Sequence, residues 1–470
     1  MKRALFILAA ALGILAAALA AWASRGEDEN PPESGARTRE AVAPADIERA
    51  VTTEALLRHL RELQAIADRN GDSRETGSPG YDESVDYVVR ILRDAGYEPE
   101  LHRFRLPVSR EREPSTLERT APSPASFRAG RDFLTLEYSG SGDVTAPLQP
   151  VDADDPTSGC ETSDFDGFTE GTVALLRRGG CFFFQKVGNA ELAGAAAVLV
   201  FNEGGPGREA PISATLVEPG VRVPVLGLSN ALGEELAGMA GVTVHVAAVV
   251  DNSEQETANV VADLPGRTDD GVVLLGAHLD SVGAGPGIND NGSGSAAILE
   301  AAVQLKRHGA RPERGMRFAF WAGEELGLHG SSEYAELLGS EIGDEIALVL
   351  NFDMIASPNF ARLVYDADPE ITDAFGAWFE SHDLETVDVV LDGRSDHAPF
   401  AEQGVPVGGL FTGADEPKTP EEEELFGGRA GEPHDACYHQ ACDTLANVDR
   451  TALGQMADAA AAVALQLAGP

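Results

Sequence analysis

The chain is 470 residues long and carries a formal net charge of −42, from 35 Lys and Arg against 77 Asp and Glu. A surface this acidic repels phosphate backbones, so we expect no nucleic-acid partner. The hydrophobic content of 43% and the charged content of 24% are those of a globular protein, and the length predicts two domains.

The N-terminal segment has the pattern of an export signal. Two basic residues precede an apolar run from Ala4 to Ala23, and Ala21-Trp22-Ala23 offers the small-x-small pattern of a signal-peptidase site. Residues 1–23 are therefore predicted to be a signal peptide, and the protein to be secreted or periplasmic. The run is also long enough to span a bilayer, so an uncleaved membrane anchor is the alternative. The composition of residues 24–45 predicts a disordered linker.

The next elements are helical. Amphipathic patterns cover Ile47–Ala67 and Tyr81–Ala95, and Gly96 ends the second helix. A short strand is expected at Tyr97–Phe104. From Leu106 to about Pro124 the sequence is rich in Pro, Arg and Glu and shows no periodicity, which indicates a domain boundary.

The following stretch, to about Val250, predicts an inserted β-rich module. It holds short β-runs with Gly-rich turns and one helix at Gln185–Ala193, but no cluster of His with carboxylates. We therefore do not expect the reaction centre there. The predicted strands are Phe133–Tyr138, Thr172–Leu176, Ala197–Phe201, Val223–Leu228 and Val242–Val249.

From Ala258 onward apolar strands alternate with amphipathic helices. This alternation predicts a three-layer α/β domain with a largely parallel central sheet. Residues 46–106 and 257–470 are assigned to this domain, and residues 107–256 to a linker and the insert. The predicted elements are strands at Val272–Ala277, Met316–Trp321 and Ile346–Phe352, and helices at Ser295–Lys306 and Thr451–Leu467.

The four cysteines are predicted to form disulfides, because the chain is expected outside the cytosol. Four cysteines allow three connectivities, and proximity in the sequence favours Cys160–Cys181 and Cys437–Cys442. The competing hypothesis is a Cys-ligated zinc ion, but the sequence has no Cys-x-x-Cys spacing.

Candidate ligands follow three of the predicted strands. His278 and Asp280 come after the first strand, Glu324 and Glu325 after the second, and Asp353 after the third. In an open α/β sheet the loops at this edge converge over the sheet, so the site is expected there.

A further carboxylate, Asp290, lies in the loop Gly283–Gly294 after the first strand. Carboxylates this close would repel one another without a cation, and imidazole with carboxylate oxygens is a typical zinc ligand set. Five ligands with one bridging carboxylate would hold two ions. The adjacent Glu324 and Glu325 suggest a division of labour, in which one binds metal and the other takes the proton from the attacking water.

Each of these features alone has an ordinary structural explanation. A His-x-Asp sequence is common, adjacent glutamates are usually a charged surface pair, and the Gly-rich loop lacks the Gly-Lys-Ser/Thr ending of a phosphate cradle. Their conjunction at consecutive strand ends is what predicts a site. Chemistry alone does not select the remaining ligand among His397, His434 and His439.

At these residues the chain resembles the zinc aminopeptidases of peptidase clan MH, most closely the secreted bacterial leucyl type. The similarity covers roughly Asp46–Phe104 and Thr257–Leu467 and is interrupted by the insert. The motifs are specific because both their order and their strand context agree. The matching segments are Gly276–Val282, Gly287–Gly294, Gly323–Gly327, Asn351–Met354, Gly393–Phe400 and Cys437–His439.

The resemblance implies two zinc ions per chain. His278, Asp290 and Asp353 would hold one zinc ion. Asp290, Glu325 and His439 would hold the other, so that Asp290 bridges the two.

The resemblance also implies roles for residues around the metals. Glu324 would be the general base, and Tyr438 would donate a hydrogen bond to the oxyanion of the tetrahedral intermediate. Asp280 would orient His278 from behind. Arg394 looks like a substrate-binding residue of the family.

Two further expectations come from relatives. The peptide bond after the bridging aspartate is cis in the family, so a cis Asp290–Asn291 bond is expected. Some secreted relatives bind calcium between an N-terminal Asp-Ile pair and two aspartates on the last helix. Asp46, Ile47 and Asp458 match that pattern, but Gly454 replaces the other carboxylate, which weakens the case for calcium.

The insert resembles a protease-associated (PA) domain. The segments that carry this likeness are Gly171–Cys181, Lys186–Ala190 and Gly194–Val198. In relatives the module is a lid or a substrate-guiding surface and is not catalytic, and the same is expected here.

The predicted function is hydrolysis of the N-terminal residue, a large apolar one, from peptide substrates by a monomeric enzyme. Carboxylates such as Glu324 and Asp353 would hold the free ammonium group. One alternative is a carboxypeptidase of the same clan, which would need a basic pocket and has only Arg394 near the motifs. The other is a catalytically inactive PA-domain receptor, which would have lost ligands or the base; none is missing from the sequence.

Overall fold

A computed structural model of the chain describes residues 41–205, 208–216 and 219–470. The predicted signal peptide and residues 24–40 of the predicted linker lie outside these ranges. The last two residues of that linker, Pro44 and Ala45, are already helical, since helix α2 spans Pro44–Ala50. In the described ranges we find no helix that is long and apolar enough to cross a bilayer.

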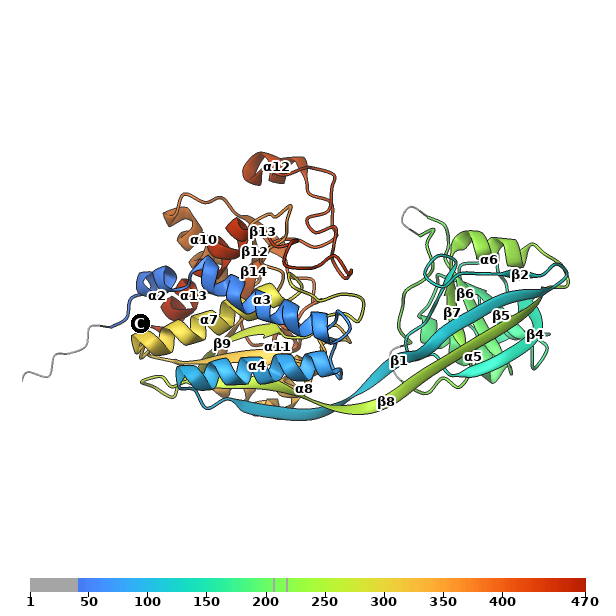
Figure 1. Ribbon diagram of the computed structural model, residues 1–470, viewed down its shortest axis with the longest axis horizontal. Coiled ribbons are helices and arrows are strands. Elements are labelled where there is room, and N and C mark those ends of the chain that lie inside the picture. Colours follow the sequence, from blue (N-terminus) through green and yellow to red (C-terminus); the bar gives the residue numbers. More distant parts are fainter. Residues whose placement is uncertain (1–40, 206–207, 217–218) are drawn as a thin grey trace, which may run out of the picture. The chain divides into compact units, whose positions relative to one another are not determined.

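A mostly parallel sheet forms the centre of the larger domain (Figure 1). Its middle strand, β9, pairs in parallel with β10 on one side and β11 on the other. Beyond β11, strand β14 is also parallel, whereas β8 pairs antiparallel with β10. The bounds are β8 Thr243–Leu264, β9 Val272–His278, β10 Gly315–Trp321, β11 Ile346–Phe352, β12 Leu363–Asp366, β13 Val387–Val390 and β14 Val407–Phe411.

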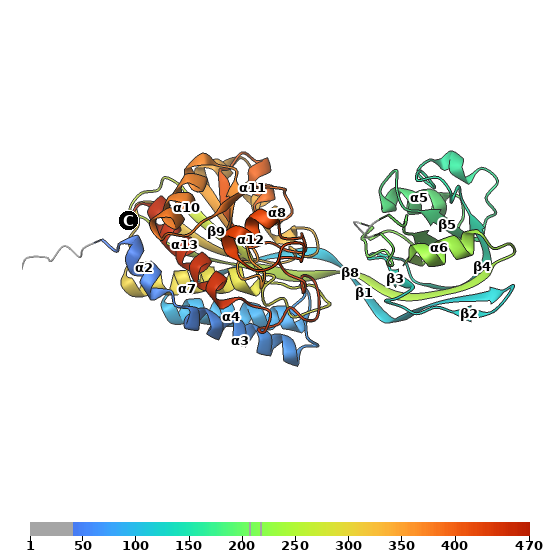
Figure 2. The ribbon, with the colours of Figure 1, turned by 90° about the horizontal axis from the view of Figure 1, so that it is seen from above.

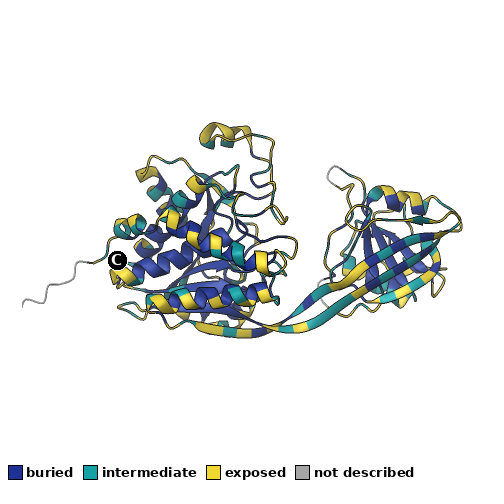
Figure 3. Cartoon of the chain, in the orientation of Figure 1, coloured by how far each residue is buried: buried dark blue, intermediate teal, exposed yellow. Residues whose placement is uncertain are grey.

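Helices cover both faces of this sheet. Along β9, Val273 and Leu275 face a core shared with α3, α4, α7, α10 and α13, whereas Leu274 faces a second core shared with α8 and α11. Figure 3 shows the consequence, with buried strands between helices that are exposed only on their outer sides. The predicted three-layer α/β domain is confirmed. The helices are α3 Thr53–Arg69, α4 Pro79–Ala95, α7 Gly292–His308, α8 His329–Leu338, α9 Ile342–Glu345, α10 Pro369–Ser381, α11 Ala398–Glu402, α12 Pro420–Phe426 and α13 Arg450–Ala468, with a 3-10 turn at Gly339–Glu341.

The single helix predicted over Ile47–Ala67 is wrong in one respect, because the chain forms two helices there. Val51 and Thr52 are extended, and the Thr52 side chain accepts a hydrogen bond from the backbone N–H of Ala55. Thr52 is thus the N-cap of α3, a role that its short hydroxyl side chain favours.

The predicted boundary between Leu106 and Pro124 is instead part of a long strand. Strand β1 spans Glu100–Ala121 and pairs antiparallel with β8 over almost its full length. Its middle, from Ser109 to Pro114, is largely exposed, and among the described residues β8 is the only strand that pairs with it there. The segment therefore lacks the buried face that gives most strands their apolar alternation.

In the insert five strands follow one another in the order β4-β5-β6-β7-β3, and β4 also pairs with β8. Figure 2 shows helices α5 and α6 of this module together with β3, β4 and β5. Helix α5 packs against one face, and α6 with parts of β1 and β8 covers the other. Strand β4 and helix α6 were not predicted. The bounds are β2 Ala125–Ser126, β3 Phe133–Thr135, β4 Gly142–Pro150, β5 Val173–Arg177, β6 Ala197–Phe201, β7 Val225–Leu228, α5 Phe183–Leu192 and α6 Asn230–Ala237, with a 3-10 turn at Thr162–Phe165.

Both predicted disulfides are confirmed. Cys160 bonds to Cys181 in the insert, and Cys437 bonds to Cys442 in the larger domain. The described part of the chain has no free cysteine.

Candidate metal centre

The predicted ligands meet at the carboxyl edge of the parallel strands. Strand β9 ends on His278, and Asp353 directly follows β11. Glu324 and Glu325 lie three and four residues past the end of β10. Asp290 precedes α7, whose N-cap residue Asn291 accepts a hydrogen bond from the backbone N–H of Gly294. The predicted ligands lie at this edge because each buried apolar strand ends where a polar loop begins, and these loops lie at the carboxyl edge of the sheet.

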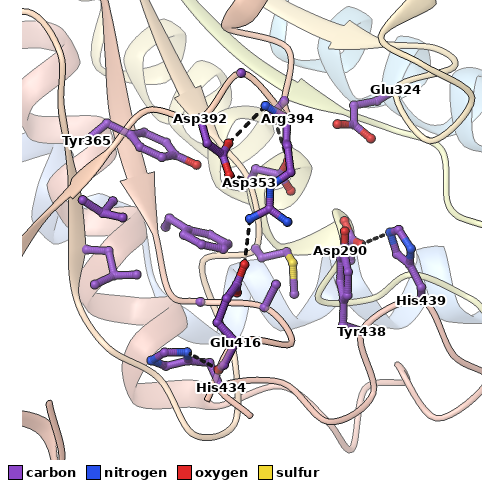
Figure 4. A pocket seen from close by; sticks show the side chains of 18 of the residues that line it. Asp290, Glu324, Asp353, Tyr365, Asp392, Arg394, Glu416, His434, Tyr438 and His439 are labelled. Carbon is purple, nitrogen blue, oxygen red and sulfur yellow. Dashed lines mark hydrogen bonds and ion pairs between the residues drawn. The ribbon is translucent and has the colours of Figure 1, made fainter. Parts of the chain in front are cut away.

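The Asp290 carboxylate faces two histidines with its two oxygens. Oδ1 lies 3.2 Å from His278 Nε2, and Oδ2 lies 3.2 Å from His439 Nε2. Asp353 Oδ1 lies 3.3 Å from His278 Nε2, and Glu325 Oε2 lies 2.9 Å from His439 Nε2. Asp290 is therefore shared between two groups of donors, and Figure 4 shows it beside His439.

Several atoms of this cluster have no hydrogen-bond partner within the part of the chain that the structure describes. They are buried and belong to His278 Nε2, Asp290 Oδ2, Glu325 Oε1 and Asp353 Oδ1. Leaving such atoms unpaired is costly, so a buried cluster of this kind needs a cation or protons. Donor atoms within 4.8 Å of one another form two overlapping groups, His278 with Glu324 and Asp353, and His278 with Asp290 and Glu325. Imidazole and carboxylate donors in this arrangement fit divalent metal ions.

Burial and mutual repulsion disfavour negative charge on the glutamates. Burial raises the pKa of Glu325 to about 7, with Asp290 adding to the rise and His439 opposing it. Burial likewise raises the pKa of Glu324 well above its ordinary value, while His278 opposes. A bound cation would relieve this cost, because it stabilises the ionised carboxylates.

The histidines respond in the opposite way. Burial lowers the pKa of His439, but its close contacts with Asp290 and Glu325 outweigh burial and raise the pKa to about 10. For His278 burial is again outweighed, here by Glu324 and Asp353, so its pKa rises well above the ordinary value. Burial would raise the pKa of Asp290, but its contacts with His278 and His439 lower it. In the metal-free cluster these pKa shifts favour the protonated forms of the histidines and glutamates, and the protons offset the negative charge that a metal ion would otherwise offset.

Two of the predicted ligands have polar neighbours outside the cluster. Ser395 Oγ donates a 2.6 Å hydrogen bond to Asp353 Oδ2 and accepts one of 2.8 Å from Asn351 Nδ2. Asp280 Oδ1 lies 3.5 Å from His278 Nδ1, behind the nitrogen that faces the cluster. Asp280 thus lies where the sequence analysis expected it, whereas the contact of Ser395 was not foreseen, although its motif was noted.

Of the three histidines left open by chemistry, His439 joins the cluster. His434 lies away from it, with Nε2 3.4 Å from Glu422 Oε2 and Nδ1 2.9 Å from the Glu416 carbonyl oxygen. His397 is buried and packs beside the ring of Tyr365. The Asp290–Asn291 peptide bond is cis, as expected.

A cavity of about 840 Å³ adjoins the cluster (Figure 4). Tyr438 borders it with its ring stacked on His439 at 3.8 Å between centroids, and burial raises its pKa well above the ordinary value. Arg394 also borders the cavity, but it is paired with Asp392 and, at 2.7 Å, with Glu416. The apolar wall of the cavity was not expected from the sequence, because strands β12 to β14 were not predicted. That wall consists of Met354, Leu363, Val387, Val389, Val390 and Phe411.

The residues considered for calcium lie outside this cluster. The Asp46 carboxylate is bonded to Arg49 at 2.6 Å. A Cβ at Gly454 would lie only 2.7 Å from Thr53 Oγ1, so the backbone leaves little room for a carboxylate there. Burial raises the pKa of Asp458 to about 7, with Glu48 adding to the rise.

An α/β sheet with histidine and carboxylate groups converging at its carboxyl edge defines a metal-dependent hydrolase. The model of peptidase family M28 matches residues 259–464, and the PA domain model matches residues 144–236. An aminopeptidase of Pseudomonas aeruginosa is 39% identical over 439 residues, which cover 89% of this chain and 82% of that protein. The chain therefore belongs to the aminopeptidases of peptidase family M28, with an inserted PA domain.

A second curated relative agrees with this assignment, and a solved structure shares the fold. A probable lipoprotein aminopeptidase of Mycobacterium tuberculosis is 39% identical over 436 residues, which cover 86% of this chain and 82% of that protein. The solved structure of a zinc aminopeptidase from Bacillus subtilis superposes with a TM-score of 0.68 at 24% identity. That match covers 88% of this chain and 95% of the Bacillus subtilis chain, so the fold extends over nearly the whole of both.

Proposed function

We propose that this protein is a zinc-dependent aminopeptidase that uses two zinc ions to release a large apolar N-terminal residue from peptides. The observation that carries the proposal is the Asp290 carboxylate, whose two oxygens each face a different histidine. His278, Asp290 and Asp353 would hold one ion. Asp290, Glu325 and His439 would hold the other.

Glu324 is the proposed general base. Its side chain borders the cavity, and its Oε2 lies 3.9 Å from His278 Nε2, so it stands beside the metal positions. Bound zinc would polarise the scissile carbonyl and favour deprotonation of the attacking water. Glu324 would accept that proton and pass it to the leaving amine. The Tyr438 hydroxyl would donate a hydrogen bond to the developing oxyanion.

The cavity supports the proposed choice of substrate. With zinc bound to the cluster, Glu324 and Asp353 would border the cavity as ionised carboxylates, which suits a free ammonium group. The apolar wall from Met354 to Phe411 suits a large apolar side chain, whose burial is favourable. Arg394 is paired with Asp392 and Glu416, which compensate its positive charge. Arg394 therefore does not provide the basic pocket that a carboxypeptidase would need.

An inactive receptor would have lost ligands or the base, but every proposed ligand and the proposed base are present in the sequence. We further propose that the protein acts outside the cytoplasm, which agrees with its two disulfides and with the lipoprotein name of the Mycobacterium tuberculosis relative.

The PA domain would guide or limit substrates, since its Glu137 borders the same cavity. A monomeric state is part of the proposal.

The test is a panel of peptides with free and with blocked N-termini, incubated with the purified protein with and without a chelator. We expect release of large apolar N-terminal residues from the free peptides only, loss of that release with the chelator, and recovery with added zinc. Cleavage of the blocked peptides from their C-terminal end would instead support the carboxypeptidase. Absence of turnover from a protein that holds two zinc ions would support the receptor.

A further inference from the structure

A single short loop, residues 435–443, reaches the metal centre at several points. The Cys437–Cys442 disulfide closes it, with the two Cα atoms 5.3 Å apart. Tyr438 and His439 lie inside the disulfide ring, and Asp443 directly follows it. One proposed ligand and one proposed catalytic side chain are thus held within a ring of a few residues.

Asp443 binds the backbone that leads into the shared carboxylate. Its two oxygens accept hydrogen bonds from the backbone N–H groups of Asn289 and Asp290, each 2.9 Å long. The side chain is buried, and Asn447 Nδ2 donates to the same carboxylate at 3.2 Å. Asp443 is therefore a positioning residue that fixes Asp290 through its main chain.

Asp435, at the other end of the loop, contacts the same segment. It accepts hydrogen bonds from Asn289 Nδ2 at 2.7 Å and from the backbone N–H of Cys437 at 2.8 Å. Asn447 Nδ2 also donates to Asp435, at 2.8 and 2.9 Å. Both ends of the disulfide loop are thus tied to the Asn289–Asp290 segment.

His439 depends on the loop more than the other proposed ligands do. Its side chain is 41% exposed, whereas those of Glu325 and Asp290 are 3% and 6% exposed. Its backbone is left-handed, with φ of 58°, which is an uncommon and costly conformation for a residue other than glycine. A short covalent ring favours such a conformation because it removes competing ones.

We propose that this disulfide loop is the positioning unit of the Asp290–Glu325–His439 metal position, and that opening the disulfide releases that ion before the other. The proposal rests on the two-zinc site proposed above. Opening the ring frees the backbone of His439, while His278 and Asp353 keep their places on the buried strand ends. Removing the Asp443 carboxylate disturbs Asp290 itself and therefore weakens both metal positions.

The test counts zinc ions per chain by elemental analysis after dialysis against a series of zinc buffers. We compare the wild type, C437S/C442S, Asp443→Asn, C160S/C181S as the disulfide control, and Asp94→Asn as an exposed charge control. In C437S/C442S we expect one ion to bind about 10–100-fold more weakly and the other to bind as in the wild type. In Asp443→Asn we expect both ions to bind more weakly, and in the two controls neither.

Each result decides the question. Two ions bound with wild-type affinity in C437S/C442S would overturn the role of the loop and leave the proposed function standing. A wild type that holds fewer than two ions would overturn the two-zinc site and this proposal with it. If C437S/C442S does not fold, the wild type is treated with a phosphine reductant, and zinc release is followed with a chromophoric indicator. Release of one ion supports the proposal, and release of none overturns it.

Discussion

Glu324 and Glu325 are neighbours in the sequence, but their surroundings differ. Glu325 Oε2 lies 2.9 Å from His439, within reach of one metal position, and its side chain is 3% exposed. Glu324 stands 3.9 Å from His278, with 10% of its side chain exposed. Two adjacent carboxylates can therefore divide the work between holding a metal ion and moving a proton.

The substitution Glu324→Gln should separate these roles. The amide side chain has nearly the same shape as the carboxylate but cannot accept the proton, so we expect kcat to fall by about 10²–10⁴. Zinc content should remain at the wild-type value, because the proposed ligands are unchanged. Glu421→Gln, on the exposed helix α12, is the control. Near-normal kcat in the Glu324 variant with zinc in place would remove this residue from the mechanism.

Most of the candidate site residues could be predicted from the sequence. His278, Glu325 and Asp353 were predicted because each follows the end of a predicted strand. Asp290 was predicted because it lies in the loop Gly283–Gly294 between the first strand and its helix. His439 was selected by family resemblance, since chemistry left it equal to His397 and His434. Asp443 gave no sequence signal, because a carboxylate that binds backbone N–H groups resembles any other buried aspartate until the fold brings the two segments together.

At the scale of elements, burial on both faces decided what could be predicted. Strands β9, β10 and β11 are mostly apolar and buried, although β10 contains Arg317 and β11 contains Asn351. Their predicted ends fall within one residue of the observed ends. Strand β1 has an exposed middle, and only its first part was predicted, as the short strand at Tyr97–Phe104. Strands β12, β13 and β14 are short, at four or five residues each, and with them the sequence analysis missed the apolar wall of the cavity.

The junction of helices α2, α10 and α13 offers a test at this scale. Glu48 on α2 accepts a hydrogen bond from Trp378 Nε1 at 3.3 Å and lies 3.1 Å from His382 Nε2. Asp458 on α13 lies in the same junction, and burial raises its pKa to about 7, with Glu48 adding to the rise and His382 opposing it. The folded state therefore keeps a proton on Asp458 that the unfolded chain has already lost.

Because its pKa is higher in the folded state than in the unfolded chain, Asp458 destabilises the folded protein above neutral pH. As the pH rises from about 4 to 7 the folded protein must either retain the proton or bury a charge, so stability falls, and the loss is complete above pH 7. Asp458→Asn should stabilise the protein by roughly 1–3 kcal/mol at pH 8 and by little at pH 4. Urea unfolding at both pH values measures this, with Asp94→Asn as the control. Destabilisation at pH 8 would show that the Asp458 charge is favourable in the folded state.

At the scale of the whole molecule, the chain consists of two modules. The larger domain supplies all the proposed metal ligands, and the PA domain contributes Glu137 to the border of the same cavity. Strands β1 and β8 belong to both modules, since β8 pairs with β10 at one end and with β4 at the other. The two modules could be predicted from their motifs. The long strands that connect them could not, because their charged and exposed middle lacks the apolar alternation of a strand.

The metal ions should also govern how stability depends on pH. Without metal, Glu325 has a pKa raised to about 7 by burial, and His439 has a pKa raised to about 10 because its carboxylate partners outweigh burial. Both groups hold protons in the folded state that the unfolded chain has released at the same pH, so the metal-free protein loses stability as the pH rises from 6 to 8. Zinc replaces these protons, and its binding strengthens as they leave.

We therefore expect the stability gap between the zinc-loaded and the metal-free protein to widen by about 1–3 kcal/mol between pH 6 and pH 8, with Glu325 and His439 both contributing. Urea unfolding of both forms at the two pH values measures the gap, and Glu325→Gln provides the control. That variant has no carboxylate to titrate, so its metal-free form should lose less stability over the same range. A gap that stays constant in the wild type would mean that the cluster does not exchange protons for metal, which would count against a metal centre built on Asp290, Glu325 and His439.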